Sequence, residues 1–331
     1  MIKRLGSMLV LLVSTLPGAV AYAAAPEEVP RRLVRTPGGD RFGYAPVARP
    51  YTRALPERVT GLLVSHDPLT GAERRCGAAV VASESRSLVL TAAHCLFDND
   101  GQARRWYDQV TFVPAYSGSG AGGAPLGVWR AVRTWVTRPW RTRSYSTEVI
   151  PHDVGVVGVE PDASGRRLED VTGPGLRPVS TRRGDGRVRA VTLPGYPSEL
   201  GYPGDAMYRC SGRAAEARTP WPGMLMTRNC QIVRGHSGGP AISGRAVVGV
   251  ATSSSPYHDP DGFSLIARLS PRRAQGLLAV AERGMAAYAA AAARSRHQAT
   301  VADSASPIGV GATPNVFWKA EESTTNGRAN W

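Results

Sequence analysis

Short apolar runs separated by Gly, Pro, Asp and Ser dominate the middle of the chain. They are rich in Val, Leu and Ala and are bounded by residues that favour turns. The runs span residues 77–82, 87–91, 110–113, 154–159, 188–193 and 246–251. Short segments of this kind are typical of β-strands rather than helices. The pattern over about residues 58–268 therefore predicts an all-β domain.

The N-terminal part of the chain has a different composition. Lys3 and Arg4 precede a short apolar stretch, and a small-x-small site follows at residues 21–23. This order predicts a secretory signal over residues 1–23 and a secreted, extracellular protein. The apolar stretch is shorter than the roughly 20 residues that a spanning helix needs, so we expect no membrane span. Residues 24–57 are rich in Pro and Arg, which predicts a leader or propeptide.

The C-terminal part predicts a helix and a tail. Ser270 and Pro271 provide an N-cap and a first-turn proline before a stretch that is dense in Ala, Leu and Arg. We expect this helix to complete a domain of residues 58–297. Residues 298–331 are rich in Gly, Ser, Thr and Asn, and predict a poorly ordered tail.

The cysteine count adds a covalent element. The chain has four cysteines, Cys76, Cys95, Cys210 and Cys230. An even number in a chain that is expected to be secreted favours two disulfides. A tetracysteine zinc site is the alternative, although no C-x2-C spacing occurs and we expect no metal.

The chain is also strongly basic. Its formal net charge is +14, and loss of the two basic residues of the predicted signal leaves 14 − 2 = +12. Such a balance favours adhesion to acidic surfaces. The arginines are scattered without a clustered tract, however, and no specific nucleic-acid partner is expected.

Three segments supply the groups that acyl transfer to a serine requires. This chemistry needs an imidazole to take the hydroxyl proton, a carboxylate to hold the imidazole, and amides that face the oxyanion. Glycines bracket Ser237 in residues 235–240 (GHSGGP), so the backbone can turn sharply and direct the Gly235 and Ser237 amides to one point. His94 follows one apolar run and Asp153 begins another. We therefore predict a catalytic triad of His94, Asp153 and Ser237.

These segments resemble the signature segments of the chymotrypsin-fold serine proteases. Residues 91–95 (TAAHC) and 235–240 carry the likeness, with His, Asp and Ser in that order along the chain. The chain is most similar to the bacterial glutamyl-endopeptidase-like branch and its actinobacterial relatives. Further segments with this similarity are 110–114, 127–129, 195–197 and 208–212. The resemblance implies two six-stranded antiparallel β-barrels with a C-terminal α-helix.

The same resemblance implies an activity and a covalent framework. The protein would be a monomeric serine endopeptidase that acts on polypeptides and needs no cofactor. The implied disulfides are Cys76 with Cys95 and Cys210 with Cys230.

The resemblance also assigns a primary substrate pocket. Gln231 would form its floor, and Thr252, Ser253 and Ser254 would line its wall. This pocket is polar and neutral, without an Asp to attract Lys or Arg. The glutamyl-specific branch normally carries a His in the strand that holds Ala251 here, so a Glu preference is not implied either.

One position departs from the animal trypsins. Those enzymes carry an Asp directly before the nucleophilic serine, and it pairs with the new N-terminal amine after activation. Here the position holds His236. A neutral imidazole lacks the required charge, and a protonated one would repel an ammonium group. We expect His236 to pack or hydrogen-bond behind the oxyanion loop instead.

The same motifs allow other interpretations. Residues 235–239 also match the G-x-S-x-G elbow of α/β-hydrolases, but that fold needs a helix after the serine and a catalytic histidine later in the chain. Here a turn follows, and His258 and His297 lie in a polar loop and at the end of a helix. A catalytically inactive binding protein on a protease scaffold is the remaining alternative. Residues 98–101 (DNDG) lack EF-hand spacing and predict a turn rather than a calcium site.

Overall fold

The computed structural model describes residues 38–304 except 101–103, 121, 182–186 and 260–261. The predicted signal, the first part of the predicted leader and most of the predicted tail lie outside these residues.

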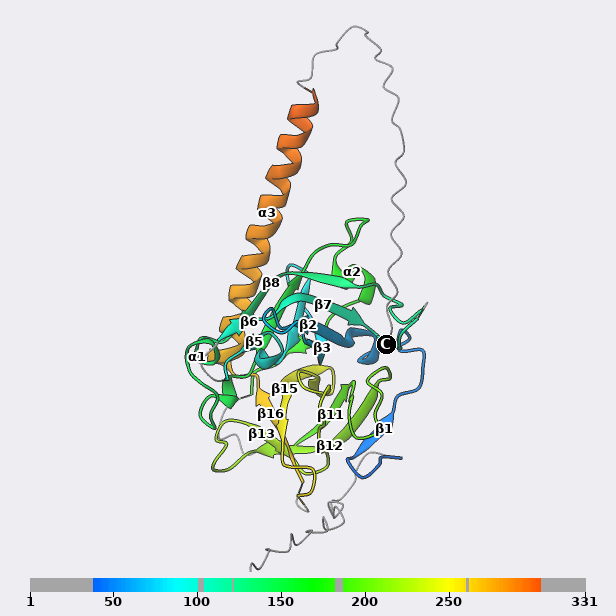
Figure 1. The fold of residues 1–331 in the computed structure, drawn as a ribbon, viewed down its shortest axis with the longest axis vertical. Helices are drawn as coiled ribbons and strands as arrows, with labels where there is room; N and C mark the ends of the chain where they lie inside the picture. Colours follow the sequence, from blue (N-terminus) through cyan, green and yellow to red (C-terminus); the bar gives the residue numbers. More distant parts are fainter. Residues whose placement is uncertain (1–37, 101–103, 121, 182–186, 260–261, 305–331) are drawn as a thin grey trace, which may run out of the picture. The chain divides into compact units, whose positions relative to one another are not determined.

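The first half of the described chain forms a closed antiparallel barrel of six strands (Figure 1). In barrel order they are β2 (Thr60–His66), β3 (Glu73–Val81), β4 (Leu88–Thr91), β9 (Gly155–Val159), β8 (Trp129–Val136) and β7 (Asp108–Pro114). Residues of β4 and β9 are buried along their whole length, which explains their uninterrupted apolar sequences. Side chains such as Leu90 and Phe112 fill the interior.

The second half forms another six-stranded antiparallel ring, closed by the pairing of β12 with β13. Its strands in order are β11 (Arg189–Gly195), β12 (Tyr208–Glu216), β13 (Leu225–Thr227), β16 (Ser264–Arg268), β15 (Ala246–Ser254) and β14 (Pro240–Ser243). Two short strands attach to this ring: β1 (Tyr44–Pro46) pairs with β12, and β10 (Arg177–Pro178) pairs with β15. The predicted pair of six-stranded barrels is confirmed.

Short elements connect the strands. A two-stranded ribbon consists of β5 (Phe97–Asp98) and β6 (Arg105–Trp106). The short helices are η1 (Glu57–Val59), η2 (Ala93–Cys95), α1 (Arg138–Thr142), η3 (Ile150–His152) and α2 (Leu168–Thr172). In residues 98–100 the carboxylate of Asp98 accepts the Asp100 N–H and pairs with Arg105. This is turn geometry, as the sequence predicted for that segment.

The predicted C-terminal helix is present with shifted boundaries. A π-helical turn, η4 (Pro271–Gln275), precedes α3 (Gly276–Ser304), which therefore starts later and extends further than expected. Leu277, Ala281 and Met285 recur at four-residue spacing and are buried, so the first part of α3 packs through one face. The rest of α3, residues 287–304, belongs to a second unit. Within the described ranges, no helix combines the length and the apolarity that crossing a membrane requires.

The globular fold starts earlier than the boundary expected near Arg58. Residues 38–57 belong to the same compact unit as the barrels, and β1 extends the second sheet. Three aromatic side chains of this segment, Phe42, Tyr44 and Tyr51, are each at most 3% exposed. Burial of these rings gives the segment the apolar contacts that its Pro- and Arg-rich composition did not indicate.

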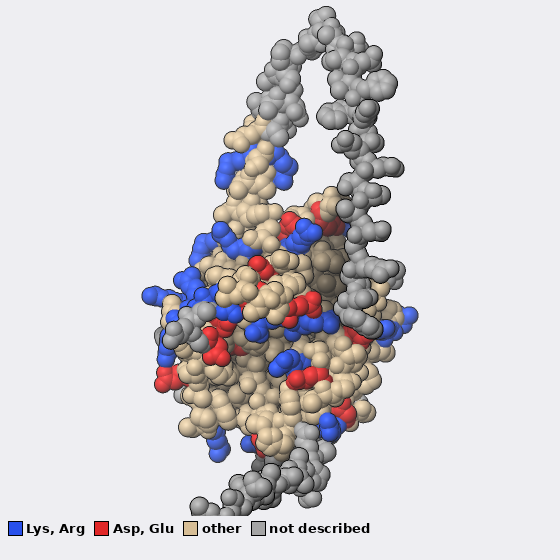
Figure 2. Space-filling model, in the orientation of Figure 1, with Lys and Arg blue, Asp and Glu red and all other residues tan. Residues whose placement is uncertain are grey.

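Charged side chains are mixed on the visible face of the molecule. Figure 2 shows basic groups interspersed with acidic groups over the described surface, rather than gathered into one tract. Some of the arginines form ion pairs, such as Arg86 with Asp170 and Arg166 with Asp162.

Candidate active site

Neighbouring strands bring the predicted histidine and aspartate together. His94 lies in η2, directly after β4, and Asp153 lies between η3 and β9. Because β4 and β9 pair with Thr91 opposite Gly155, the segments that carry the two side chains leave the barrel side by side. Ser237 comes from the second barrel, in the turn before β14. A cavity of about 660 Å³ is lined by both His94 and Ser237.

Asp153 is a buried carboxylate with three donors. It is 1% exposed. The His94 backbone N–H donates to Oδ1 at 2.8 Å, and His94 Nδ1 lies 2.7 Å from Oδ2. The Thr252 hydroxyl also donates to Oδ2. Because a carboxylate only accepts, His94 Nδ1 carries the proton in this pair and Nε2 is the basic nitrogen.

Ser237 is held by its backbone. Its carbonyl oxygen accepts the Gly77 N–H at 2.7 Å, across the junction of the two barrels, and the Gly238 N–H donates to Ala251 O at 2.7 Å. Among the described residues, Ser237 Oγ is not hydrogen-bonded to His94, although both side chains border the cavity. Such contacts between a nucleophile and its base often close only when substrate is bound.

The loop of residues 233–237 makes a tight turn before Ser237. The His236 N–H donates to Val233 O at 3.1 Å, and Gly235 between them has φ +88°. A Cβ at Gly235 would lie 2.5 Å from both Tyr196 O and Ser198 Oγ, so conformation and space both require glycine. Within the described residues, the Gly235 and Ser237 amides donate to no backbone carbonyl. Gly235 and Ser237 both line the cavity.

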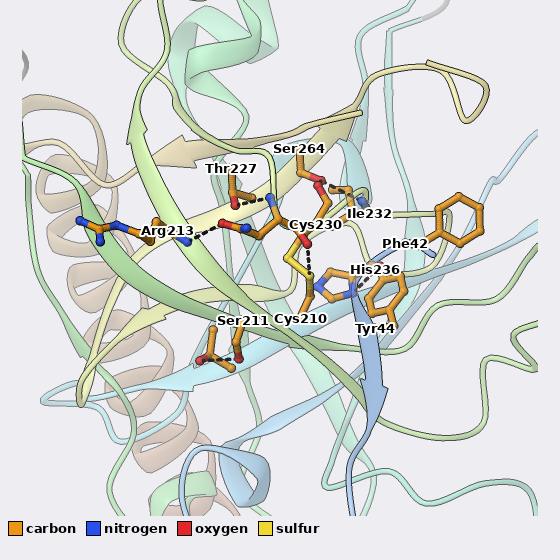
Figure 3. Close-up of a disulfide and its surroundings, with 12 residues drawn as sticks. Phe42, Tyr44, Cys210, Ser211, Arg213, Thr227, Cys230, Ile232, His236 and Ser264 are labelled. Atoms are coloured by element: carbon orange, nitrogen blue, oxygen red, sulfur yellow. Dashed lines mark hydrogen bonds between the residues drawn. A yellow bond between two sulfur atoms is a disulfide. The ribbon is translucent and has the colours of Figure 1, made fainter. Parts of the chain in front are cut away.

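A tyrosine that sequence reasoning missed lies behind this loop. His236 is fully buried, and burial lowers its pKa to about 3. Its Nδ1 lies 3.0 Å from the hydroxyl of Tyr44, and the Val233 N–H donates to the same hydroxyl oxygen at 3.3 Å. Figure 3 shows the two rings next to each other beside the Cys210–Cys230 disulfide. Tyr44 lies in the predicted leader, where composition offered no sign of a contact with the site.

Three of the four residues expected to form the substrate pocket line the cavity, and the fourth does not. Thr252, Ser253 and Ser254 line the cavity. Gln231 is fully buried and is not among the residues that line it; its amide nitrogen donates to the carbonyl oxygens of Ser255 at 3.2 Å and Pro256 at 2.7 Å. The cavity lining also includes residues that the sequence did not single out: Arg74, Arg75, Ile232, Val233, Arg234 and Tyr257.

The four cysteines form the pairs that the resemblance implies. Cys76 is bonded to Cys95, next to His94, and Cys210 is bonded to Cys230. Cys76, His94 and Cys95 lie close enough together to suggest a metal site by distance alone. Cysteines in a disulfide have no thiolate to offer, so neither this group nor the four cysteines together fit a zinc ion.

The two barrels and the cavity at their junction define the class of this protein as a double-barrel serine protease fold. Residues 77–250, more than half of the chain, match the family described as the trypsin-like peptidase domain, and the chain belongs to this family. No curated protein sequence matches the chain.

Solved structures agree on the fold. The thermostable serine protease AL20 from an extremophilic microorganism is 21% identical with a TM-score of 0.59, and the match covers 69% of this chain and 98% of that one. Protease Anisep from Arthrobacter nicotinovorans is 22% identical with a TM-score of 0.57, covering 68% and 95%. A Glu endopeptidase is 15% identical with a TM-score of 0.55, covering 72% and 96%. These likenesses show that the fold is that of the bacterial serine proteases.

Proposed function

We propose that this protein is a secreted serine endopeptidase that cleaves polypeptides through His94, Asp153 and Ser237. The observation that carries the proposal is the hydrogen-bonded pair of buried Asp153 and His94 at the edge of a cavity that also bears Ser237. Membership of the trypsin-like peptidase family supports the same reaction class.

The proposed reaction has two halves. In the first, Ser237 Oγ attacks the carbonyl carbon of the substrate while His94 Nε2 takes the hydroxyl proton, and the Gly235 and Ser237 amides stabilise the oxyanion. The proton then passes from His94 to the leaving amine, the C–N bond breaks and an acyl-enzyme remains. In the second half, water attacks the ester carbonyl with His94 again as base, which releases the acid and restores Ser237.

Asp153 has an orienting role in this proposal. Its carboxylate holds the Nδ1–H tautomer of His94 and stabilises the imidazolium that forms during each half-reaction. The Thr252 hydroxyl donates to Oδ2 of the same carboxylate, the oxygen that also contacts His94 Nδ1, and helps to hold it in place. Ser253 and Ser254 line the same cavity and are the proposed wall of the primary substrate pocket.

Secretion is part of the proposal. It is supported by the sequence of residues 1–23 and by the two disulfides, since disulfides persist in oxidising compartments. N-terminal sequencing of protein recovered from culture medium tests it. Recovery of the active protein only inside cells, with residues 1–23 retained, would contradict it.

The decisive experiment is labelling with a fluorophosphonate probe, followed by peptide mapping and a protease assay. We expect the probe on Ser237, and expect Ser237→Ala to lose both labelling and proteolysis, leaving at most the roughly 10³- to 10⁴-fold residual rate over water that remains when a triad is broken. Ser243→Ala is the matched control, because Ser243 lies at the end of β14 and does not line the cavity.

Two outcomes would refute the assignment. Undiminished proteolysis by Ser237→Ala would remove Ser237 from the reaction. A folded wild-type protein that is neither labelled nor proteolytic would favour the inactive binding protein instead.

A further inference from the structure

We propose that the segment Asp40 to Pro46 is a permanent part of the catalytic domain and that Tyr44 is a positioning residue for the 233–237 loop. The proposal rests on the proposed function, because it concerns the amides that would bind the oxyanion. It differs from the expectation that the whole leader up to about Glu57 is removed.

The segment is built into the second barrel on two sides. On one side β1 pairs with β12, with Tyr44 opposite Cys210. On the other, the Gln231 N–H donates to Phe42 O at 3.0 Å, in the stretch that leads into the 233–237 loop. Between these contacts Gly43 has φ +84°, and a Cβ there would lie 2.2 Å from Asn229 O. The close approach of the two backbones indicates a fitted strand rather than a detachable cover.

The hydroxyl of Tyr44 joins the two ends of the turn that precedes Ser237. Its oxygen accepts the Val233 N–H at 3.3 Å, and it lies 3.0 Å from His236 Nδ1. His236 Nε2 is buried without a hydrogen-bond partner among the described residues, so the Tyr44 hydroxyl is the side-chain partner of this ring there. The Tyr44 side chain, which comes from the predicted leader, therefore contacts both Val233 and His236, the two ends of the turn that contains Gly235.

The surroundings of His236 make this hydroxyl a specific partner. The imidazole is fully buried and packs flat against Gly195, where a Cβ would lie 2.8 Å from Nδ1. Burial keeps the ring neutral by lowering its pKa. Tyr44 is itself 1% exposed. The Tyr44 hydroxyl thus contacts both Val233 and neutral His236, and no charged group takes part. The animal trypsins have an Asp at the position of His236, and that Asp forms an ion pair with the chain terminus.

In this arrangement, an ordered 233–237 loop requires Tyr44 and does not require a free N-terminal amine. Asp40 fixes the start of the segment, because its Oδ1 accepts the backbone N–H groups of Phe42 and Tyr44 and its Oδ2 accepts the Tyr202 hydroxyl. The N-terminus of the active protein should therefore lie at or before Asp40. Cleavage near Arg58 would remove Tyr44 together with β1.

The first test compares Tyr44→Phe with Tyr51→Phe in the full chain. Both changes delete the hydroxyl of a buried tyrosine within residues 38–57. The Tyr44 hydroxyl accepts the N–H of Val233, in the 233–237 loop, whereas the Tyr51 hydroxyl accepts the N–H of Met207, outside that loop. We expect Tyr44→Phe to lower kcat about tenfold with KM within twofold, because the oxyanion amides act in the transition state. The rate of fluorophosphonate labelling should fall equally, and Tyr51→Phe should keep wild-type kinetics.

The second test is N-terminal sequencing of the probe-labelled, active protein, which does not depend on the folding of any variant. A start at or before Asp40 supports the proposal. An active species that begins at Arg58, or otherwise lacks Tyr44, overturns it.

The kinetic outcomes separate this proposal from the proposed function. One outcome is that Ser237→Ala is inactive while the kcat of Tyr44→Phe equals that of the wild type or falls no further than the kcat of Tyr51→Phe. The positioning role of Tyr44 is then wrong, and the protease assignment stands. If Ser237→Ala is active, the proposed function fails first.

Discussion

Asp153 has a negative charge at a position almost without solvent, and the donors around it decide whether that charge is tolerated. His94 supplies two of the hydrogen bonds and Thr252 the third. Hydrogen bonds to a charged group contribute about 1.5–3 kcal/mol each, more than those between neutral groups. Thr252, which sequence reasoning assigned to the pocket wall, therefore also acts on the catalytic side of the cavity.

Replacing Thr252 by Val should affect both activity and stability. The change keeps the shape of the side chain and removes the donor to Asp153, so we expect kcat to fall about tenfold and the free energy of unfolding to fall by about 2 kcal/mol. Steady-state kinetics and urea unfolding measure the two effects. Thr181→Val is the control: Thr181 is buried, and its hydroxyl has no partner among the described residues. Equal losses in both variants would argue against a specific bond.

The buried imidazole of His236 should make stability depend on pH. Its pKa in the folded state is about 3, below the value of about 6.5 in an unfolded chain. Between these values the unfolded chain binds a proton that the folded protein does not, so stability is fully present above pH 6.5 and is lost as the pH falls toward 3. The loss is at most about 1.4 kcal/mol per pH unit.

Urea unfolding from pH 7 to pH 3.5 measures this dependence, in the Ser237→Ala variant to prevent self-digestion. His236→Asn in the same background should unfold with a smaller slope against pH. Parallel curves for the two proteins would show that His236 does not remain neutral in the folded state.

At the scale of elements, each disulfide joins a barrel strand to a segment beside the site: Cys76 of β3 to Cys95 of η2, and Cys210 of β12 to Cys230. Cys210 lies in β12, and Cys230 lies in the stretch that leads to the 233–237 loop. The cysteines of each pair are 19 and 20 residues apart. In the chain-entropy model, closing a loop of that size stabilises the folded state by about 3 kcal/mol.

The double variant Cys210→Ala, Cys230→Ala should therefore lose about 3 kcal/mol of unfolding free energy, measured by urea unfolding in the Ser237→Ala background. Peptide mapping without reduction should recover Cys76 linked to Cys95 and Cys210 linked to Cys230. A Cys95 to Cys210 link would contradict both the pairing and the placement of these elements.

For the whole molecule, the neutral His236 and the pairing of β1 with β12 predict that activity does not depend on the exact position of the chain terminus. The predicted leader cleavage is then not coupled to a buried ion pair at the N-terminus. Adding one residue before the mature N-terminus, wherever sequencing places it, should leave kcat/KM within a few-fold of the native value. A collapse of activity in a folded variant would show that the free amine organises the site through another partner.

The amino-acid sequence by itself predicted the class of the fold, which the structure confirms, and named the three residues of the proposed triad. Runs such as 77–82 and 246–251 are apolar throughout because β3 and β15 are buried over most of their lengths, so local composition was sufficient to predict them. By contrast, β8 is buried only at its two ends, and its arginines, Arg130 and Arg133, are exposed. Composition alone did not identify it, and only the resemblance of residues 127–129 pointed to its start.

Only the tertiary structure decided how distant segments support the site. Tyr44 and His236 are 192 residues apart, and their contact exists because β1 joins the edge of β12, a pairing that no local pattern specifies. The Thr252 hydroxyl bonds to Asp153 only because β15 passes beside the first barrel at that residue. Local propensity and motif chemistry act over a few residues, whereas these contacts depend on how two closed barrels meet.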